Sequence, residues 1–195
     1  MPCGATLQVT AVANRQDDVD HTDHADIEIR VLPVLPRERT DVIIRQQLRD
    51  RGWVEQPDGS LHKEIGEAVA VLPADSNTVR VTLSDQTTVA VTSQAKGNVA
   101  VTNEARGRAQ VEQRAAQEAE TKLAAAAAAA RKALEAKTAE TLLKVWHEVR
   151  AELAEVVNVT TKQALQERAS ELGSIDSVTE ARGDHGYEIT ITVRT

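Results

Sequence analysis

The sequence predicts an α+β protein with a small antiparallel sheet and one packing helix, a long alanine-rich helix or helical hairpin, and a C-terminal β-hairpin. Between residues 27 and 101, short alternating apolar runs are separated by turn-forming residues, which is typical of an antiparallel sheet. From about Asn103 to Val157 the chain has no proline and contains the alanine run 124–130, which indicates a long helix. Two more alternating runs after residue 174 flank a glycine-containing turn and predict the hairpin.

We expect residues 1–26 to form an acidic, partly disordered segment, with a short strand over Leu7–Val12. The tract from Asp17 to Asp26 holds five aspartates and two histidines, and its only apolar residues are Val19 and Ala25. Two histidines three residues apart are compatible with a divalent ion, but a metal site needs ligands that a folded frame holds in place. We therefore interpret the tract as a solvated loop and predict no metal site.

We expect residues 27–101 to form an α+β domain. It begins with a strand over Ile27–Val31, and helical spacing then predicts a helix over Thr40–Arg51 that Thr40 caps and Gly52 ends. The strands expected after it are Leu61–Ile65, Ala68–Leu72, Thr78–Leu83, Thr87–Val91 and Val99–Val101, with turns at 57–59, 75–77, 84–86 and 96–98. Because the alternation is one-sided, we expect the helix to cover one face of the sheet.

The long helical region, residues 103–173, carries apolar residues at a regular spacing of three or four. At about 1.5 Å per residue the part up to Val157 would span roughly 80 Å, so a second copy, another protein or the folded-back chain must pack along it. The apolar residues recur about every 3.75 positions, which favours a straight or slightly right-handed packing. We interpret them as a partner-binding surface, the helix seam. Its members are Val111, Ala115, Ala119, Leu123, Ala126, Ala130, Leu134, Leu142, Val145, Val149 and Leu153, and Thr138 and Val156 share the spacing.

The helical region has a candidate break near residues 158–161. β-Branched residues are concentrated there, and Thr160 with Gln163 has the spacing of a capping box. The sequence leaves open whether the helix is continuous or bent at this point. We expect residues 174–195 to form a β-hairpin that packs on the sheet, with its turn at Arg182–Gly186.

Composition and charge exclude several classes of partner. The formal net charge is −7, and the basic residues are scattered along the chain instead of clustered. The aromatic residues are Trp53, Trp146 and Tyr187, too few to make a base-stacking surface. No stretch approaches the ~20 apolar residues of a membrane span, and the single cysteine, Cys3, cannot form an intramolecular disulfide. We therefore expect a cytoplasmic protein that binds neither nucleic acid nor membrane.

No combination of residues identifies a reaction. Phosphate-loop and dinucleotide patterns do not occur in the sequence, and no histidine, serine or cysteine arrangement pairs a nucleophile with a base. The triplet Arg182-Gly183-Asp184 is expected to supply turn residues. We predict that the chain is not an enzyme and needs no cofactor.

The C-terminal block carries a family resemblance. It consists of ALQERASELGSIDSV at 164–178, followed by YEITI at 187–191. This block resembles the small accessory proteins that accompany an FtsH-type AAA+ protease and a von Willebrand A-domain protein in bacterial ternary conflict systems. The resemblance implies a non-enzymatic adaptor that works with an ATPase, and it brings no catalytic or binding residues with it.

We expect the chain to be an adaptor or assembly component that binds a protein partner through its long alanine-rich helix, with an AAA+ ATPase or protease as one candidate partner. The alternative is a structural homo-oligomer in which identical helices pair. An enzyme with a dispersed site is the third hypothesis. A homo-oligomer should stay associated when it is purified alone, whereas an adaptor need not associate until its partner is added.

Overall fold

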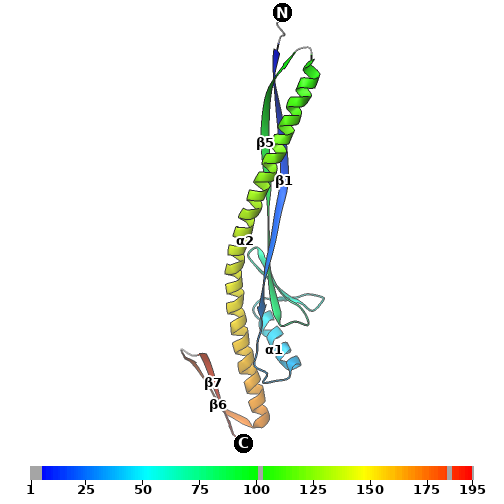
Figure 1. The fold of residues 1–195 in the computed structure, drawn as a ribbon. Helices are drawn as coiled ribbons and strands as arrows, with labels where there is room; N and C mark the ends of the chain where they lie inside the picture. Colours follow the sequence, from blue (N-terminus) through cyan, green and yellow to red (C-terminus); the bar gives the residue numbers. More distant parts are fainter. Residues whose placement is uncertain (1–5, 101–102, 184–185, 195) are drawn as a thin grey trace, which may run out of the picture. The chain divides into compact units, whose positions relative to one another are not determined.

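The structure is a computed structural model that describes residues 6–100, 103–183 and 186–194, and it confirms the α+β class (Figure 1). The elements are β1 (Thr6–Glu28), α1 (Arg37–Arg49), β2 (Val54–Glu55), β3 (Leu61–Ile65), β4 (Ala68–Leu72), β5 (Thr78–Ala100), α2 (Glu104–Leu172), β6 (Ser174–Gly183) and β7 (Gly186–Arg194). Five strands form one sheet in the order β1-β5-β4-β3-β2, and β6 and β7 form a separate two-stranded sheet.

The chain divides into two compact units, each built from segments that are far apart in the sequence. Unit 1 combines the described residues up to Asp23 with Ser84–Ala139, and unit 2 combines His24–Leu83 with the described residues from Glu140 onward. The strands β1 and β5 and the helix α2 contribute residues to both units. The consecutive segments expected from the sequence stay a prediction.

The acidic tract Asp17–Asp26 lies within the strand β1, so the expectation of a loop there is wrong. Polar contacts between β1 and β5 account for the strand. The Thr88 hydroxyl donates to the Asp18 carboxylate at 2.7 Å, and the Thr92 hydroxyl donates to the Asn14 side chain at 2.9 Å. These cross-strand pairs stabilise the two strands at polar positions, which is why apolar alternation alone did not reveal the full length of the pairing.

The strand β5 is continuous over Thr78–Ala100, so the turns expected at 84–86 and 96–98 are wrong. In the part that belongs to unit 1, its odd-numbered residues are the more buried ones, from half-buried Asp85 to buried Val99. Gly97 is one of these residues, and a Cβ added there would lie 2.5 Å from a methyl group of Val111 on α2. The glycine therefore allows the helix to approach the strand closely, and it does not mark a turn.

The helix α1 starts at Arg37, three residues before the expected N-cap. Pro36 precedes it without a side-chain cap, so the prediction that Thr40 caps the helix is wrong. Thr40 lies inside the first turn, where it is buried and its hydroxyl donates to the Pro36 carbonyl at 3.2 Å. Gly52 has a φ of +86°, the left-handed conformation expected of a glycine that follows a helix end.

Unit 2 contains the main apolar core. In this core the helix α1, the inner face of β3, β4 and the first part of β5, and the second half of α2 pack together. Its most deeply buried members are Leu48, Trp53, Leu61, Ala68, Ala70, Leu72, Val79, Val81, Leu83, Val149, Leu153 and Val156. The expectation that one helix covers the sheet is therefore incomplete, because residues of α2 pack into the same core.

The C-terminal hairpin pairs Ser174 with Arg194 at its open end, and the register shifts once between Ile175 and Ser177. The predicted turn at Arg182–Gly186 includes residues 184–185, which lie outside the described residues. Ile189 of β7 lies with Val157 and Leu165 of α2 around one hollow. The hairpin therefore borders the helix, while its packing on the sheet stays a prediction.

The helix α2 is continuous from Glu104 to Leu172, so residues 158–161 do not break it. Thr160, the expected N-cap, is fully buried inside the helix, and its hydroxyl has no hydrogen-bond partner among the described residues. Most buried hydroxyls are paired because an unpaired one loses its hydrogen bonds to water without replacement.

We expect the substitution Thr160→Val to raise the free energy of unfolding by about 1 kcal/mol, because valine keeps the shape and removes the unpaired hydroxyl. Urea unfolding followed by circular dichroism measures the change. The matched control is Thr138→Val, since the buried Thr138 hydroxyl donates to the Leu134 carbonyl at 2.9 Å and should give no gain. A loss of stability in the Thr160 variant would show that its hydroxyl is satisfied.

Candidate protein-interaction site

The first part of the helix seam packs on the strands of unit 1. Val111 and Ala115 of α2 form an apolar cluster with Ala95 and Val99 of β5, and Val9, Ala11 and Ala13 of β1 pack against this cluster. Gly107 of α2 lies directly against Val99 of β5, since a Cβ added at Gly107 would lie 2.1 Å from a methyl group of Val99. Ala119, the next seam residue, is also fully buried.

The last part of the helix seam belongs to the core of unit 2. Leu142, Val149 and Leu153 are buried members of that core, and Val145 packs against it while remaining half-buried. Val156 continues the same buried row. These side chains contact the chain's own strands and α1, so a partner could reach them only after the core opened.

The middle of the helix seam is more accessible. Leu123, Ala126 and Ala130 are half-buried, whereas Leu134 is buried. The sequence pattern therefore identified which face of α2 is apolar, and the structure gives most of that face a role in the two cores. Partner binding along the seam stays a prediction.

A polar contact joins α2 to the core of unit 2. The Glu152 carboxylate accepts a hydrogen bond from the Trp53 indole N–H at 3.0 Å. It also forms an ion pair with the Lys63 ammonium group at 2.7 Å. The Lys63 ammonium group also donates to the Arg51 carbonyl at 3.2 Å. With these partners the carboxylate is satisfied in a partly buried position, so the contact fixes α2 on the sheet.

In unit 1 an ion pair connects α2 to β5. The Lys137 ammonium group lies 2.6 Å from the Asp85 carboxylate. The hydrogen bond from Lys137 lowers the pKa of Asp85, and the Gln86 backbone N–H adds to the effect. A lowered pKa means that this carboxylate stabilises the fold above the pKa of the unfolded chain, and that the contribution is lost as the pH falls through the folded pKa.

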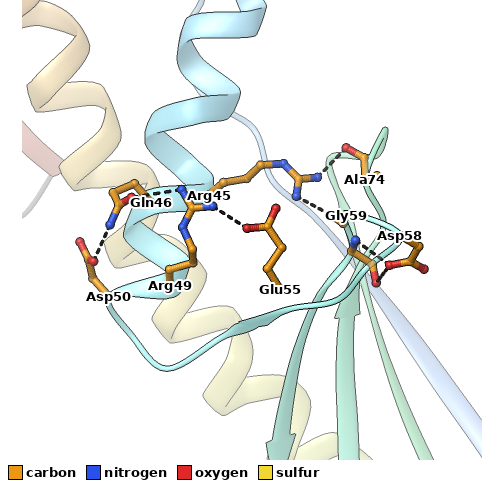
Figure 2. A network of polar contacts seen from close by, with 9 residues as sticks. Arg45, Gln46, Arg49, Asp50, Glu55, Asp58, Gly59 and Ala74 are labelled. Carbon is orange, nitrogen blue, oxygen red and sulfur yellow. Dashed lines mark hydrogen bonds and ion pairs between the residues drawn. The ribbon is translucent and has the colours of Figure 1, made fainter.

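Arginines of α1 hold the loops of unit 2 together (Figure 2). The Arg45 guanidinium group donates to the backbone carbonyls of Gly59 at 2.7 Å and of Ala74 at 2.5 Å. One turn later Arg49 forms an ion pair with Glu55 at 2.8 Å. An arginine can join two loops in this way because its guanidinium group holds five N–H donors in a fixed planar arrangement. This network therefore positions the turns around α1, and its arginines are occupied by the protein itself.

The connection between β1 and α1 presents the most exposed large apolar side chain among the described residues. Leu32 is 64% exposed and borders two hollows. One has a volume of about 340 Å³ and lies beside α1, where Thr40 and Ile44 line it. The other has a volume of about 410 Å³ and lies beside α2 and β7. We call Leu32 and these two hollows the Leu32 surface.

The acidic tract does not bring its histidines together. His21 is half-buried and His24 is exposed, and residues three apart in a strand point to opposite faces of the sheet. Within residues 6–100, 103–183 and 186–194, no group of three or more potential metal ligands occurs. Asp26 instead pairs with Arg80 at 2.9 Å, and this hydrogen bond lowers the pKa of Asp26.

Comparison with known families identifies the chain. The family model for FtsH ternary system domain X5 matches residues 3–195. The chain belongs to this family. The resemblance seen in the C-terminal block is therefore confirmed, and the X5 match extends it to both units and to the whole of α2. No curated protein and no solved structure matches the chain.

Membership in the X5 family makes the chain an accessory component of an FtsH ternary system. In the part of this X5 protein that the structure describes, no helix combines the length and apolar character needed to cross a membrane. Sequence reasoning missed the Leu32 surface, because Leu32 lies after the alternating run Ile27–Val31 and directly before Pro33, where the periodic pattern stops. The only available signal was the pattern of Pro33 and Pro36 around apolar residues, which predicts an ordered, extended connection.

Proposed function

We propose that this X5 protein is a cytoplasmic, non-enzymatic adaptor that binds another protein of its FtsH ternary system, with an FtsH-type AAA+ protease as the first candidate. The family match over residues 3–195 carries the proposal, because a component of a multi-protein system works next to other proteins.

We place the partner contact at the Leu32 surface of unit 2. Exposed apolar residues next to hollows are typical of protein-interaction sites, since a partner side chain can fill the hollow while the apolar residue is removed from water. Val31 and Leu35 add apolar lining, and Arg37 and Asp41 supply charges at the rim. The partner expected here presents an apolar side chain flanked by polar residues.

The Leu32 surface is a better candidate than the helix seam because it requires no unfolding. Binding at Leu142, Val149 or Leu153 would expose apolar core before a partner could replace it. Each such side chain contributes about 1.5–3 kcal/mol of burial, so opening several of them would oppose association strongly. The Leu32 surface has no such cost in the described structure.

The experiment measures binding of the purified full chain to the purified FtsH-type protease of the same system by biolayer interferometry. We expect Leu32→Asp to raise the Kd at least about tenfold, because a charge would have to be buried in an apolar contact. The matched control is Val54→Asp, since Val54 is 60% exposed in unit 2 and lines none of the hollows described here.

Two results would contradict the proposal at different levels. If the protease binds the Leu32→Asp variant and the unaltered chain equally well, the adaptor role holds and the contact lies elsewhere. If the unaltered chain binds neither the protease nor the other proteins of the system, the adaptor role itself is wrong.

A further inference from the structure

Among the described residues, the strand β7 pairs only with β6, so its other side is an outer edge of the two-stranded sheet. A two-stranded sheet has two outer edges, and each presents unpaired backbone N–H and C=O groups. Three apolar residues of β7, Ile189, Ile191 and Val193, are only half-buried on the face of the hairpin that they share. A two-stranded hairpin is at best marginally stable without further strands or packing, so addition of strands to β7 would stabilise it.

The other sheet edges in the described part of the chain are protected over all or part of their length. β1 carries the five aspartates of the tract Asp17–Asp26, which would repel the same tract of a second copy. β2 is two residues long, and β6 has an irregular register between Ile175 and Ser177. Short edges, charges and bulges are the usual means of preventing edge pairing. β7 has none of these features between Glu188 and Arg194.

The sequence of β7 is complementary to itself when two copies run antiparallel about Ile191. This register pairs Ile191 with Ile191, Thr190 with Thr192, and Ile189 with Val193 of the second copy. Residues directly opposite in an antiparallel pair lie on the same face of the sheet, so apolar residues meet apolar residues and threonines meet threonines.

The same register also matches the charges at the two ends of the strand. Glu188 of each copy lies opposite Arg194 of the other, so the dimer gains two Glu–Arg ion pairs. Arg194 already contacts Asp176 of its own hairpin at 2.7 Å in an exposed pair. A guanidinium group has five N–H donors, so it can hold both carboxylates at once.

From this complementarity we infer that the protein forms a twofold homodimer by antiparallel pairing of β7 with β7 of a second copy, giving a four-stranded sheet in the order β6-β7-β7-β6. The twofold axis passes through Ile191, perpendicular to the sheet. The apolar faces of both hairpins therefore lie on the same side. This dimer does not depend on the adaptor role, because its partner is a second copy of the chain. Ile189 is common to β7 and to the Leu32 surface, where it lines the hollow beside α2.

Charge exchange tests the register. In sedimentation equilibrium across a concentration series, the full chain should approach twice the mass of one chain. We expect Glu188→Arg alone and Arg194→Glu alone to raise the dimer Kd about tenfold each, because like charges then face each other twice across the axis. The double variant, which exchanges the two charges, should restore the original Kd. Asp176→Asn is the matched control, since it removes the contact within the hairpin and leaves the β7 pair unchanged.

A cross-link tests the axis independently. Opposite residues at the axis have Cβ atoms about 4.5–5.5 Å apart, close enough for a disulfide after a small shift. In a Cys3→Ser background, Ile191→Cys should oxidise to a covalent dimer, whereas Thr179→Cys on β6 should not, with helix content checked by circular dichroism. A monomer at all concentrations would overturn the inference. A dimer whose Kd is the same in the single charge variants, and which gives no cross-link, would also overturn the inference, because it would use another surface.

Discussion

Replacing Leu142 by alanine is expected to lower the free energy of unfolding by about 2–5 kcal/mol. Leu142 is 6% exposed and belongs to the core of unit 2, so its removal leaves a cavity among the residues of the sheet and α2. Both tryptophans of the chain, Trp53 and Trp146, also belong to unit 2, and their fluorescence during guanidinium unfolding reports on that unit.

The adjacent leucine supplies the control. Leu143 is on the same helix but 56% exposed, so Leu143→Ala should change the free energy of unfolding by no more than about 0.5 kcal/mol. If both variants unfold like the original chain and Leu142→Ala instead weakens association, the helix seam is an open interface and not part of the core.

The second large effect is expected at Gly107. Replacing an exposed helical glycine by alanine usually stabilises a helix by about 1 kcal/mol. Here the added Cβ would lie 2.1 Å from one methyl group of Val99 and 2.7 Å from the other. Valine has few alternative rotamers, so the helix or the strand must move, and we expect Gly107→Ala to destabilise unit 1 by about 1–3 kcal/mol.

Hydrogen exchange of peptides from Ser84–Ala139 measures this change, because unit 1 contains no tryptophan. The double variant Gly107→Ala with Val99→Ala provides the test of mechanism. Shortening Val99 removes the clashing methyl groups, so the double variant should lose less protection than the sum of the two single variants. Strict additivity would mean that the close approach of α2 to β5 does not constrain residue 107.

Local patterns in the sequence predicted the elements that carry strong periodicity. The strands β3 and β4 have the expected bounds, and the spacing from Val111 to Leu153 identified the buried face of α2. The sequence could not show what that face packs against. A helix contacting its own chain and a helix contacting another protein need the same apolar residues, and only long-range topology separates the two cases.

The long strands were missed because their stability comes from partners far away in the sequence. Asp18 was expected in a loop and Thr88 in a short separate strand, yet the two residues pair across the long strands β1 and β5. Gly97 likewise resembles a turn residue, although its role is to make space for Val111. The Leu32 surface belongs to the same class, since its hollows exist only after α1, α2 and β7 have come together.

The interleaving of the two units also sets the order in which the protein can fold during synthesis. Unit 1 needs β1, the later part of β5 and the first half of α2, so it cannot be completed until residue 139 has left the ribosome. Unit 2 waits longer, because its core requires Val149, Leu153 and Val156 near the end of the chain. Until then the apolar faces of α1, β3 and β4 stay exposed in the nascent chain, where they are open to chaperones and proteases.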